Sequence, residues 1–156
     1  MNGDPGTYAL VFECVRRAEV DVGRLGTIRL EAGYYVYVGS ALGPGGVKAR
    51  VLRHWRPDKR QHWHIDYVGA HLRPHCAWYL HGTRREEHRW AQALISAREI
   101  EPVPGFGASD CACRSHFFRM PDLPVADVFA RIAGPAVRCA FAEERAWSVA
   151  SAARSA

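Results

Sequence analysis

Two tyrosines in short strand-like motifs are the residues of this sequence best suited to chemistry. Tyr8 closes a Gly-Thr-Tyr motif, and Tyr37 opens a Tyr-Val-Gly-Ser motif. A basic segment predicted to be helical follows Tyr37, and it carries Arg50 and His54 four positions apart, the spacing of neighbours on one helix face. Glu87 adds a carboxylate at the start of a second predicted helix. Two phenols, a guanidinium and a carboxylate suit the hydrolysis of a phosphodiester.

Each group would have a defined part in such a reaction. A phenol can take the proton of an attacking water where cations lower its pKa, and a guanidinium can bind the non-bridging oxygens. A divalent metal ion on one carboxylate can assist the departing alkoxide. Taken singly, each residue also suits a structural role, since Tyr8 shares a strand face with Leu10 and Phe12 and Glu87 alone fits a solvated surface. Only the combination points to catalysis.

Glu87 rather than Glu86 is the expected metal ligand. Thr83 and Glu86 have the spacing of a capping box, in which both side chains satisfy free N–H groups at a helix start. A glutamate folded back onto its own helix is not available to an ion. The carboxylate of Glu87 stays free.

A small mixed domain is expected to position these residues. Alternating apolar residues predict strands, and apolar residues three and four positions apart predict helices. In chain order the predicted elements are strands at 7–15, 25–30 and 34–38, a helix at 47–55, a strand at 76–80, a helix at 83–97, a strand at 115–120 and a helix from 124 to about 132. The short connection at 31–33 predicts a hairpin of the second and third strands. We expect an α/β fold of the α+β kind, with an antiparallel sheet of three to four strands flanked by helices.

Length and composition predict one domain in a reducing compartment. The 156 residues suffice for a single core, assigned to 1–135, and the segment 136–156, rich in Ala, Arg and Ser, is expected to be a peripheral tail. Five cysteines without a secretory leader argue against a disulfide framework and favour the cytoplasm. No apolar stretch approaches the roughly 20 residues of a membrane span.

The charge of the chain favours an anionic partner. A net charge of +5 and a pI near 9.2 suit a nucleic acid, and the basic residues concentrate between 48 and 64, interleaved with Trp55 and Trp63. The alternative is a solvated helix face. The residues expected to contact nucleic acid are Ser40, Lys48, Arg53, Arg56, Lys59 and Arg60.

Further polar residues suit either the lining of a site or a buried network. They are His62, His64, Asp66, Asp110 and His116. Cys111, Cys113 and His116 have ligand types that suit a structural Zn²⁺, although the fourth ligand is not evident, with Cys76, His62 and His64 as candidates. The alternative is a buried loop in which the cysteines pack as small apolar residues.

The arrangement as a whole resembles the GIY-YIG nuclease superfamily, whose two motifs correspond to residues 6–8 and 37–39. It most resembles the Uri-type branch, small proteins also found fused to endonuclease III-type repair enzymes. The segments that carry this resemblance are GYYVYVGSA at 33–41, Arg53-His54, HWHIDY at 62–67 and GFGASDCACRSH at 105–116. The two tyrosines stand 29 positions apart, and we assign residues 16–30 to an inserted hairpin strand.

The resemblance implies a role for each candidate residue. Tyr37 would be the general base, and Tyr8 would orient water or phosphate beside it. Arg50 would bind the scissile phosphate, and His54 would assist there. Glu87 would hold one Mg²⁺ or Mn²⁺ ion.

The expected function is therefore that of a metal-dependent endonuclease, acting on DNA in repair or in the processing of structured DNA. Two alternatives belong to other classes: a non-catalytic nucleic-acid-binding module of the same fold, and a zinc-stabilised interaction domain. The sequence leaves DNA and RNA both open, because phosphate contacts carry no base information.

Overall fold

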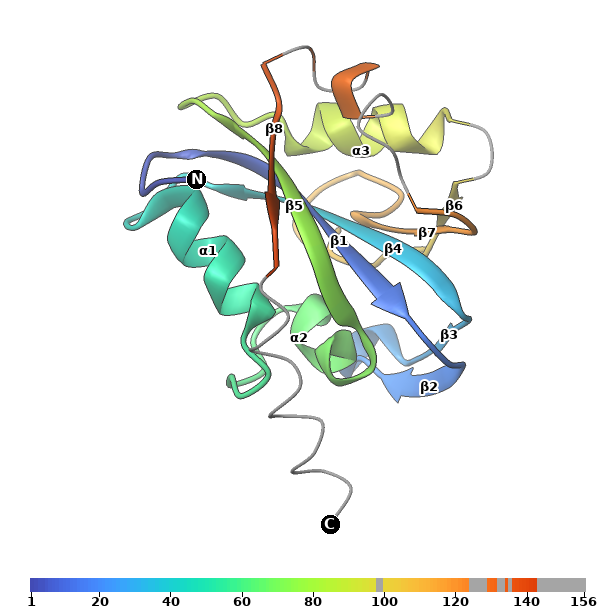
Figure 1. Cartoon of the computed structure of the whole chain (residues 1–156). Helices are drawn as coiled ribbons and strands as arrows, with labels where there is room; N and C mark the ends of the chain where they lie inside the picture. Colours follow the sequence, from blue (N-terminus) through green and yellow to red (C-terminus); the bar gives the residue numbers. More distant parts are fainter. Residues whose placement is uncertain (98–99, 124–128, 132–133, 135, 143–156) are drawn as a thin grey trace.

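The computed structural model describes residues 1–97, 100–123, 129–131, 134 and 136–142 (Figure 1). Its main sheet has six antiparallel strands in the order β6-β7-β4-β1-β5-β8, and a separate hairpin pairs β2 with β3. The predicted α+β class is confirmed, but the sheet is larger than the three to four strands expected. The elements are β1 (Gly6–Cys14), β2 (Ala18–Asp21), β3 (Thr27–Leu30), β4 (Gly33–Ala41), α1 (Gly46–Trp55), α2 (His64–Val68), β5 (Arg73–His81), α3 (Glu87–Ile95), β6 (Glu101–Pro102), β7 (Phe117–Met120) and β8 (Arg138–Phe141), with short 3₁₀ turns at Gly23–Leu25 and Gly69–His71.

Helices cover both faces of the sheet. The face that carries Tyr8, Leu10 and Phe12 packs against α1, α2 and the β2–β3 hairpin. The opposite face, with Ala9 and Val11, packs against α3. Figure 1 shows the same layering, with α1 and α3 on opposite sides of the sheet. β1 is consequently buried on both faces, and the side chains of its central residues have fixed positions.

The predicted hairpin between 25–30 and 34–38 is wrong. β3 pairs with β2, so that Thr27 lies opposite Asp21, whereas β4 pairs with β1 along its whole length. The physical reason is burial: the apolar residues of β4 face both layers, and only a central position beside β1 covers both. The expectation of an inserted hairpin within 16–30 agrees with β2 and β3.

The insertion lies at the far end of the strands from the tyrosine motifs. β1 starts beside Tyr8 and enters the insertion after Cys14, and β4 resumes at Gly33 opposite Cys14. Tyr8 and Tyr37 therefore lie on neighbouring antiparallel strands despite their separation in the sequence. Tyr8 faces Gly39 and Tyr37 faces Leu10, which makes the two tyrosines diagonal neighbours on one face.

The helices near the site follow the local sequence pattern, with one exception. α1 begins one residue before the predicted helix, and it buries Val47, Val51 and His54 along one face before Pro57. The predicted capping box at Thr83 is wrong. α3 begins only at Glu87, and its N-cap Glu86 makes no side-chain capping bond but pairs with Arg84 and Arg89 instead.

The end of the chain contributes an additional strand. Residues Arg138–Phe141, within the segment expected to be a peripheral tail, form β8 at the edge beside β5. Residues 143–156 and the start of the predicted helix, 124–128, lie outside the described residues. Among the residues that are described, no helix has the length and apolar character that crossing a membrane requires.

Candidate active site

The five residues predicted to do chemistry line one cavity. Tyr8 and Tyr37 come from the sheet, Arg50 and His54 from α1, and Glu87 from the first turn of α3. The cavity has a volume of about 300 Å³ and is partly open to solvent. Residues from four separate elements therefore converge on one concave surface.

The position of the cavity follows from the length of β7. β7 starts at Phe117 opposite Tyr37, so the residues of β4 after Tyr37 have no strand partner on that side. The loop before β7 fills part of the gap, where the N–H of Val38 donates to the carbonyl of His116 at 2.9 Å. The start of α3 reaches the same place, and Glu87 and His88 join the lining there.

Tyr8 is fixed by packing and by a histidine. Its hydroxyl shares a hydrogen bond of 3.0 Å with His54 Nε2, and both residues are buried. The ring passes directly over Gly39, where a Cβ atom would stand 2.7 Å from the Tyr8 oxygen. Burial and the neighbouring Tyr37 raise the pKa of Tyr8 well above its usual value, although Arg50 opposes them.

Tyr37 presents a freer hydroxyl. Its ring packs edge-on against His54, with the centroids 5.7 Å apart, and against Phe106. Within the described part of the chain its hydroxyl has no hydrogen-bond partner, and the residue lines the cavity. Burial, Asp66 and Glu87 raise the pKa of Tyr37, while Arg50 lowers it. This phenol is therefore neutral at pH 7 and open to the cavity.

A buried carboxylate stands behind His54. Asp66 receives two hydrogen bonds from the Arg53 guanidinium, at 3.1 and 3.0 Å, and lies 3.9 Å from His54 Nδ1. Burial raises the pKa of Asp66, but the Arg53 bonds and the backbone N–H groups of Trp63 and His62 outweigh it and keep the pKa below its usual range. Asp66 therefore belongs to a buried network behind the cavity and does not line it.

His54 is neutral at physiological pH. Burial, the Lys59 ammonium and the two nearby guanidinium groups lower its pKa to about 3, against the opposing effect of Asp66. A neutral imidazole can accept the Tyr8 proton or donate to the Tyr8 oxygen, according to its tautomer. His54 thus holds Tyr8 without adding charge.

Arg50 is positioned by the aromatic ring of Trp63. From the sequence, Trp63 stood out only as an aromatic residue within the basic segment. Its guanidinium carbon lies 4.5 Å from the centroid of Trp63, and that of Arg53 lies 4.2 Å from the same ring. Cation–π contacts of this kind limit the rotamers of the long side chain. Trp63 itself lines the cavity.

Glu87 offers a carboxylate to the cavity from its α3 side. Its side chain is 12% exposed and pairs with Arg85 at 3.2 Å. Only Glu87 of the two adjacent glutamates lines the cavity, and its role as a metal ligand stays a prediction. Glu86 is occupied by Arg84 and Arg89 rather than by a capping box, and it does not line the cavity.

The basic residues expected to bind nucleic acid divide into separate groups. Arg53 and Lys59 both approach the buried carboxylate of Asp66, and the Lys59 side chain is 8% exposed. Both are therefore engaged within the protein, and their phosphate contacts stay a prediction. Lys48 and Arg60 are exposed. Arg56 is exposed too, but it lines a different cavity beside Trp55.

The remaining predicted residues are also divided. Ser40, Asp110 and His116 line the cavity, and the Ser40 hydroxyl lies 3.2 Å from that of Thr7. His62 is exposed, and His64 accepts a hydrogen bond from the Gly107 N–H at 3.0 Å. Neither belongs to the cavity lining.

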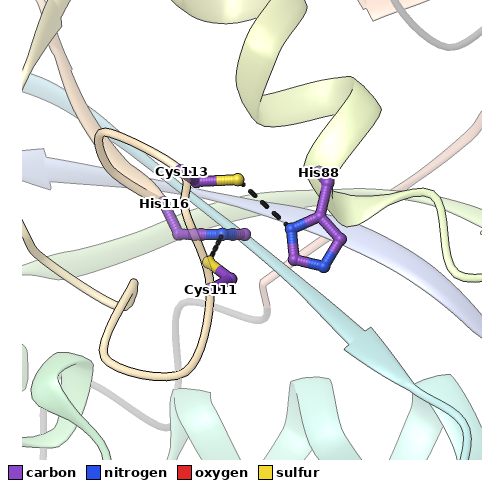
Figure 2. A group of neighbouring side chains, drawn as sticks. All are labelled: His88, Cys111, Cys113 and His116. Carbon is purple, nitrogen blue, oxygen red and sulfur yellow. Dashed lines mark hydrogen bonds between the residues drawn. The ribbon is translucent and has the colours of Figure 1, made fainter.

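A candidate metal-binding cluster adjoins the cavity. The ligand atoms of His88, Cys111, Cys113 and His116 all lie within 4.8 Å of one another. Figure 2 shows them converging from α3 and from the loop before β7, with His88 facing Cys113 and His116 facing Cys111. The fourth member is His88, whereas the sequence analysis considered Cys76, His62 and His64. The five cysteines of the chain are free thiols.

Sequence reasoning missed His88, Arg85 and Gly107 as cavity residues. His88 follows Glu87 directly, and a histidine adjacent to a predicted metal ligand was a signal that could have found it. Gly107 has a φ of +71°, and a Cβ atom there would stand 3.0 Å from His116 and 3.2 Å from Tyr37, a closeness that only the folded loop reveals.

Comparison with curated proteins and with solved structures gave no match. A family model does match residues 7–134, which contain all five converging residues and the cysteine–histidine cluster. The chain belongs to the family described as domain of unknown function DUF123.

Proposed function

We propose that this cleft hydrolyses phosphodiester bonds of nucleic acid, as a metal-dependent endonuclease related to the GIY-YIG superfamily. The observation that carries the proposal is the convergence of Tyr8, Tyr37, Arg50, His54 and Glu87 on one cavity. Each supplies a group that the reaction needs, and no two neighbouring elements could supply all of them. Packing alone does not require this set of polar groups at a concave surface.

The tyrosines have unequal roles in this reaction. The Tyr8 hydroxyl is engaged by His54 and fixed over Gly39, so it orients water or phosphate. The Tyr37 hydroxyl is open to the cavity, so its phenolate is the base. The phenol first releases its own proton to solvent, a loss that Arg50 favours, and the phenolate then takes the proton of the attacking water. The water oxygen bonds to phosphorus, the bond to the departing oxygen breaks, and solvent protonates that oxygen.

Arg50 stabilises the charge that develops on the phosphoryl group. It is held over Trp63 and faces the cavity, where a guanidinium can bind two non-bridging oxygens at once. Because its position is set before the substrate binds, the arginine needs little reorganisation during the reaction. Arg50 also opposes the carboxylates that raise the pKa of Tyr37.

Glu87 fits a magnesium or manganese ion. It is a carboxylate in a concave site, with Asp110 as a second carboxylate in the lining, and hard oxygen ligands suit Mg²⁺ and Mn²⁺. When bound, the ion would neutralise charge on the departing oxygen and offset the effect of Glu87 on Tyr37. Arg85, which pairs with Glu87 at 3.2 Å, would release it on metal binding.

A nucleic acid is the substrate that the surroundings favour. The chain carries +5 net charge, Arg50 and Arg85 line the cavity, and Lys48 and Arg60 are exposed. Such cations bind a phosphate backbone through charge, with strong salt dependence and without reading bases.

A cleavage assay tests the proposal. The full chain is incubated with Mg²⁺ or Mn²⁺ and labelled single-stranded, duplex, flap and branched DNA, with RNA of the same sequences. We expect cleavage of at least one substrate, loss of it in Tyr37→Phe, and its retention in Tyr35→Phe. Tyr35 is a matched control two positions away on the same strand face, buried, with its hydroxyl bonded to the Glu31 backbone. Salt-sensitive binding without cleavage of any substrate would support the non-catalytic binding module instead.

A further inference from the structure

We propose that His88, Cys111, Cys113 and His116 bind one zinc ion through two thiolates and two imidazoles. This ion would fasten the loop before β7 to the first turn of α3, at the rim of the cleft. The site is distinct from the hard-ligand site at Glu87, and zinc binding itself does not depend on the proposed nuclease activity.

The distances suit a tetrahedral ion. With Zn–S of about 2.3 Å and Zn–N of about 2.1 Å, the S···N edges of a tetrahedron are roughly 3.6 Å. His88 Nδ1 lies 3.2 Å from Cys113 Sγ, and His116 Nε2 lies 3.3 Å from Cys111 Sγ. No pair of the four ligand atoms exceeds 4.8 Å, so small rotations of the side chains complete the geometry.

The ligand types select the metal and its role. Thiolate and imidazole ligands favour zinc over magnesium, manganese or calcium, which prefer oxygen. Four protein ligands occupy a tetrahedral zinc fully and leave no position for a substrate, as in structural sites. The cluster is also only partly exposed, because His116 is 3% exposed and the other three are intermediate.

The backbone around the cluster is already ordered for such a site. The N–H of His116 donates to Phe106 at 2.8 Å, and its carbonyl accepts from Val38 at 2.9 Å. Near the base of the loop, the Gly105 N–H donates to the Arg114 carbonyl at 2.9 Å. These bonds hold His116 against β4. They do not join the loop to His88 on α3, and the zinc ion would provide that link.

A zinc ion here would also orient Glu87, an inference that rests on the proposed function. His88 faces Cys113 with Nδ1 (Figure 2). Its other ring nitrogen, Nε2, lies 3.7 Å from Glu87 Oε1. Metal-bound histidines commonly donate their second N–H to a carboxylate. His88 would therefore be a positioning residue for Glu87.

Metal analysis tests the zinc site without any activity measurement. The full chain, produced without a polyhistidine tag and dialysed, should contain about one zinc per chain by elemental analysis. Cys113→Ser should lose at least about nine-tenths of it, because three remaining ligands bind zinc far more weakly. Cys139→Ser is the matched control, a partly buried cysteine outside the cluster, and should keep its zinc. Absence of zinc from the wild-type chain, or equal loss in Cys139→Ser, would overturn the proposal.

A second measurement on the unaltered chain covers the case in which Cys113→Ser does not fold. Replacing zinc with Co²⁺ should give the intense visible bands of tetrahedral cobalt and a thiolate-to-cobalt charge-transfer band. A mercurial reagent that modifies thiols should release the metal stoichiometrically. Weak octahedral bands without charge transfer, or metal retained after complete thiol modification, would contradict the site. If zinc is present and cleavage is not, the proposed function fails while the zinc site stands.

Discussion

Two walls enclose the cleft, and they are held in different ways. One wall consists of Tyr8 and Tyr37 on the sheet, backed by His54 and the Asp66 network. The other consists of the first turn of α3 and the loop that carries Cys111 and His116. The first wall is formed by β1 and β4, which are distant in the sequence but pair in register, and the buried carboxylate of Asp66 forms an ion pair with Arg53 behind it. The second has backbone hydrogen bonds within the loop, and the candidate metal cluster lies between that loop and α3.

The difference shows how a cleft can combine rigid and adjustable parts. The tyrosine wall is set when the core folds, because its residues belong to the largest buried cluster. The wall that carries Glu87 would be equally fixed if the proposed zinc ion joined the four side chains of the cluster.

Asp66→Asn, behind the wall that carries Tyr8 and Tyr37, should cause the largest loss of unfolding free energy. It leaves Arg53 and Lys59 beside a neutral amide, and breaking a buried ion pair costs about 3–5 kcal/mol of unfolding free energy. Urea denaturation measures the change. Glu19→Gln is the matched control, because Glu19 also pairs with an arginine, Arg29, but at the surface, where the loss should be below about 1 kcal/mol. Equal losses in the two variants would mean that Asp66 supports no buried network.

Arg50→Ala should leave the fold intact and slow cleavage. Removing one preorganised donor to developing charge typically lowers kcat by about 10²–10³-fold, or roughly 2.7–4 kcal/mol. Single-turnover rates on the best DNA substrate give the effect, and Arg29→Ala on the inserted hairpin should match the wild type. Arg50→Lys sharpens the test, since it keeps the charge and loses the two-pronged geometry. Full activity in Arg50→Ala would remove the phosphate-binding role.

The stability of the protein should fall as the pH drops below about 6.5. The His54 pKa is lowered to about 3 in the folded chain, so on acidification the unfolded chain takes up this proton first. The loss attributable to His54 should be about 2 kcal/mol between pH 7 and pH 5. Denaturation at both pH values compares the wild type with His54→Gln, in which this part of the loss should vanish. An unchanged difference would show that His54 is not buried in its neutral form. His64 and His116, whose pKa values burial also lowers, remain in both proteins.

Gly107→Ala should disturb the contact between the walls. Its φ of +71° disfavours a side chain by roughly 1–2 kcal/mol, and the new Cβ would lie 3.0 Å from His116 and 3.2 Å from Tyr37. Gly43→Ala adds a methyl group to the same cavity where nothing lies within 4 Å, and it should leave stability unchanged. Thermal unfolding of both variants measures the difference, and identical curves would mean that the walls do not touch at this residue.

The sequence predicts the local parts of this structure well. The period of β1 and the spacing of α1 place Tyr8, Arg50 and His54 correctly, because strand and helix geometry depend on neighbouring residues. The partner of β4 was mispredicted because pairing depends on burial across the whole sheet. Edge strand β8 was missed for a similar reason, since its pairing with β5 spans the chain.

The site shows the same division. Glu87 was separated from Glu86 by a capping box that does not form, and it is the position of Glu87 in the cavity lining that distinguishes the two glutamates in the fold. Lys59 appeared as a surface cation, but a buried carboxylate, Asp66, draws it inward. His88 was missed because it joins Cys113 across 25 positions, a contact that only the fold creates.

The cleavage rate of Glu87→Ala relative to that of Glu86→Ala tests whether the cleft is a metal-dependent nuclease site. The two glutamates are adjacent, yet only Glu87 lines the cavity with the tyrosines. We predict metal-dependent cleavage of DNA by the wild type and by Glu86→Ala, and loss of cleavage in Glu87→Ala across the whole range of Mg²⁺ and Mn²⁺ concentrations. Undiminished cleavage by Glu87→Ala would contradict the claim that the two walls form a metal-dependent nuclease site.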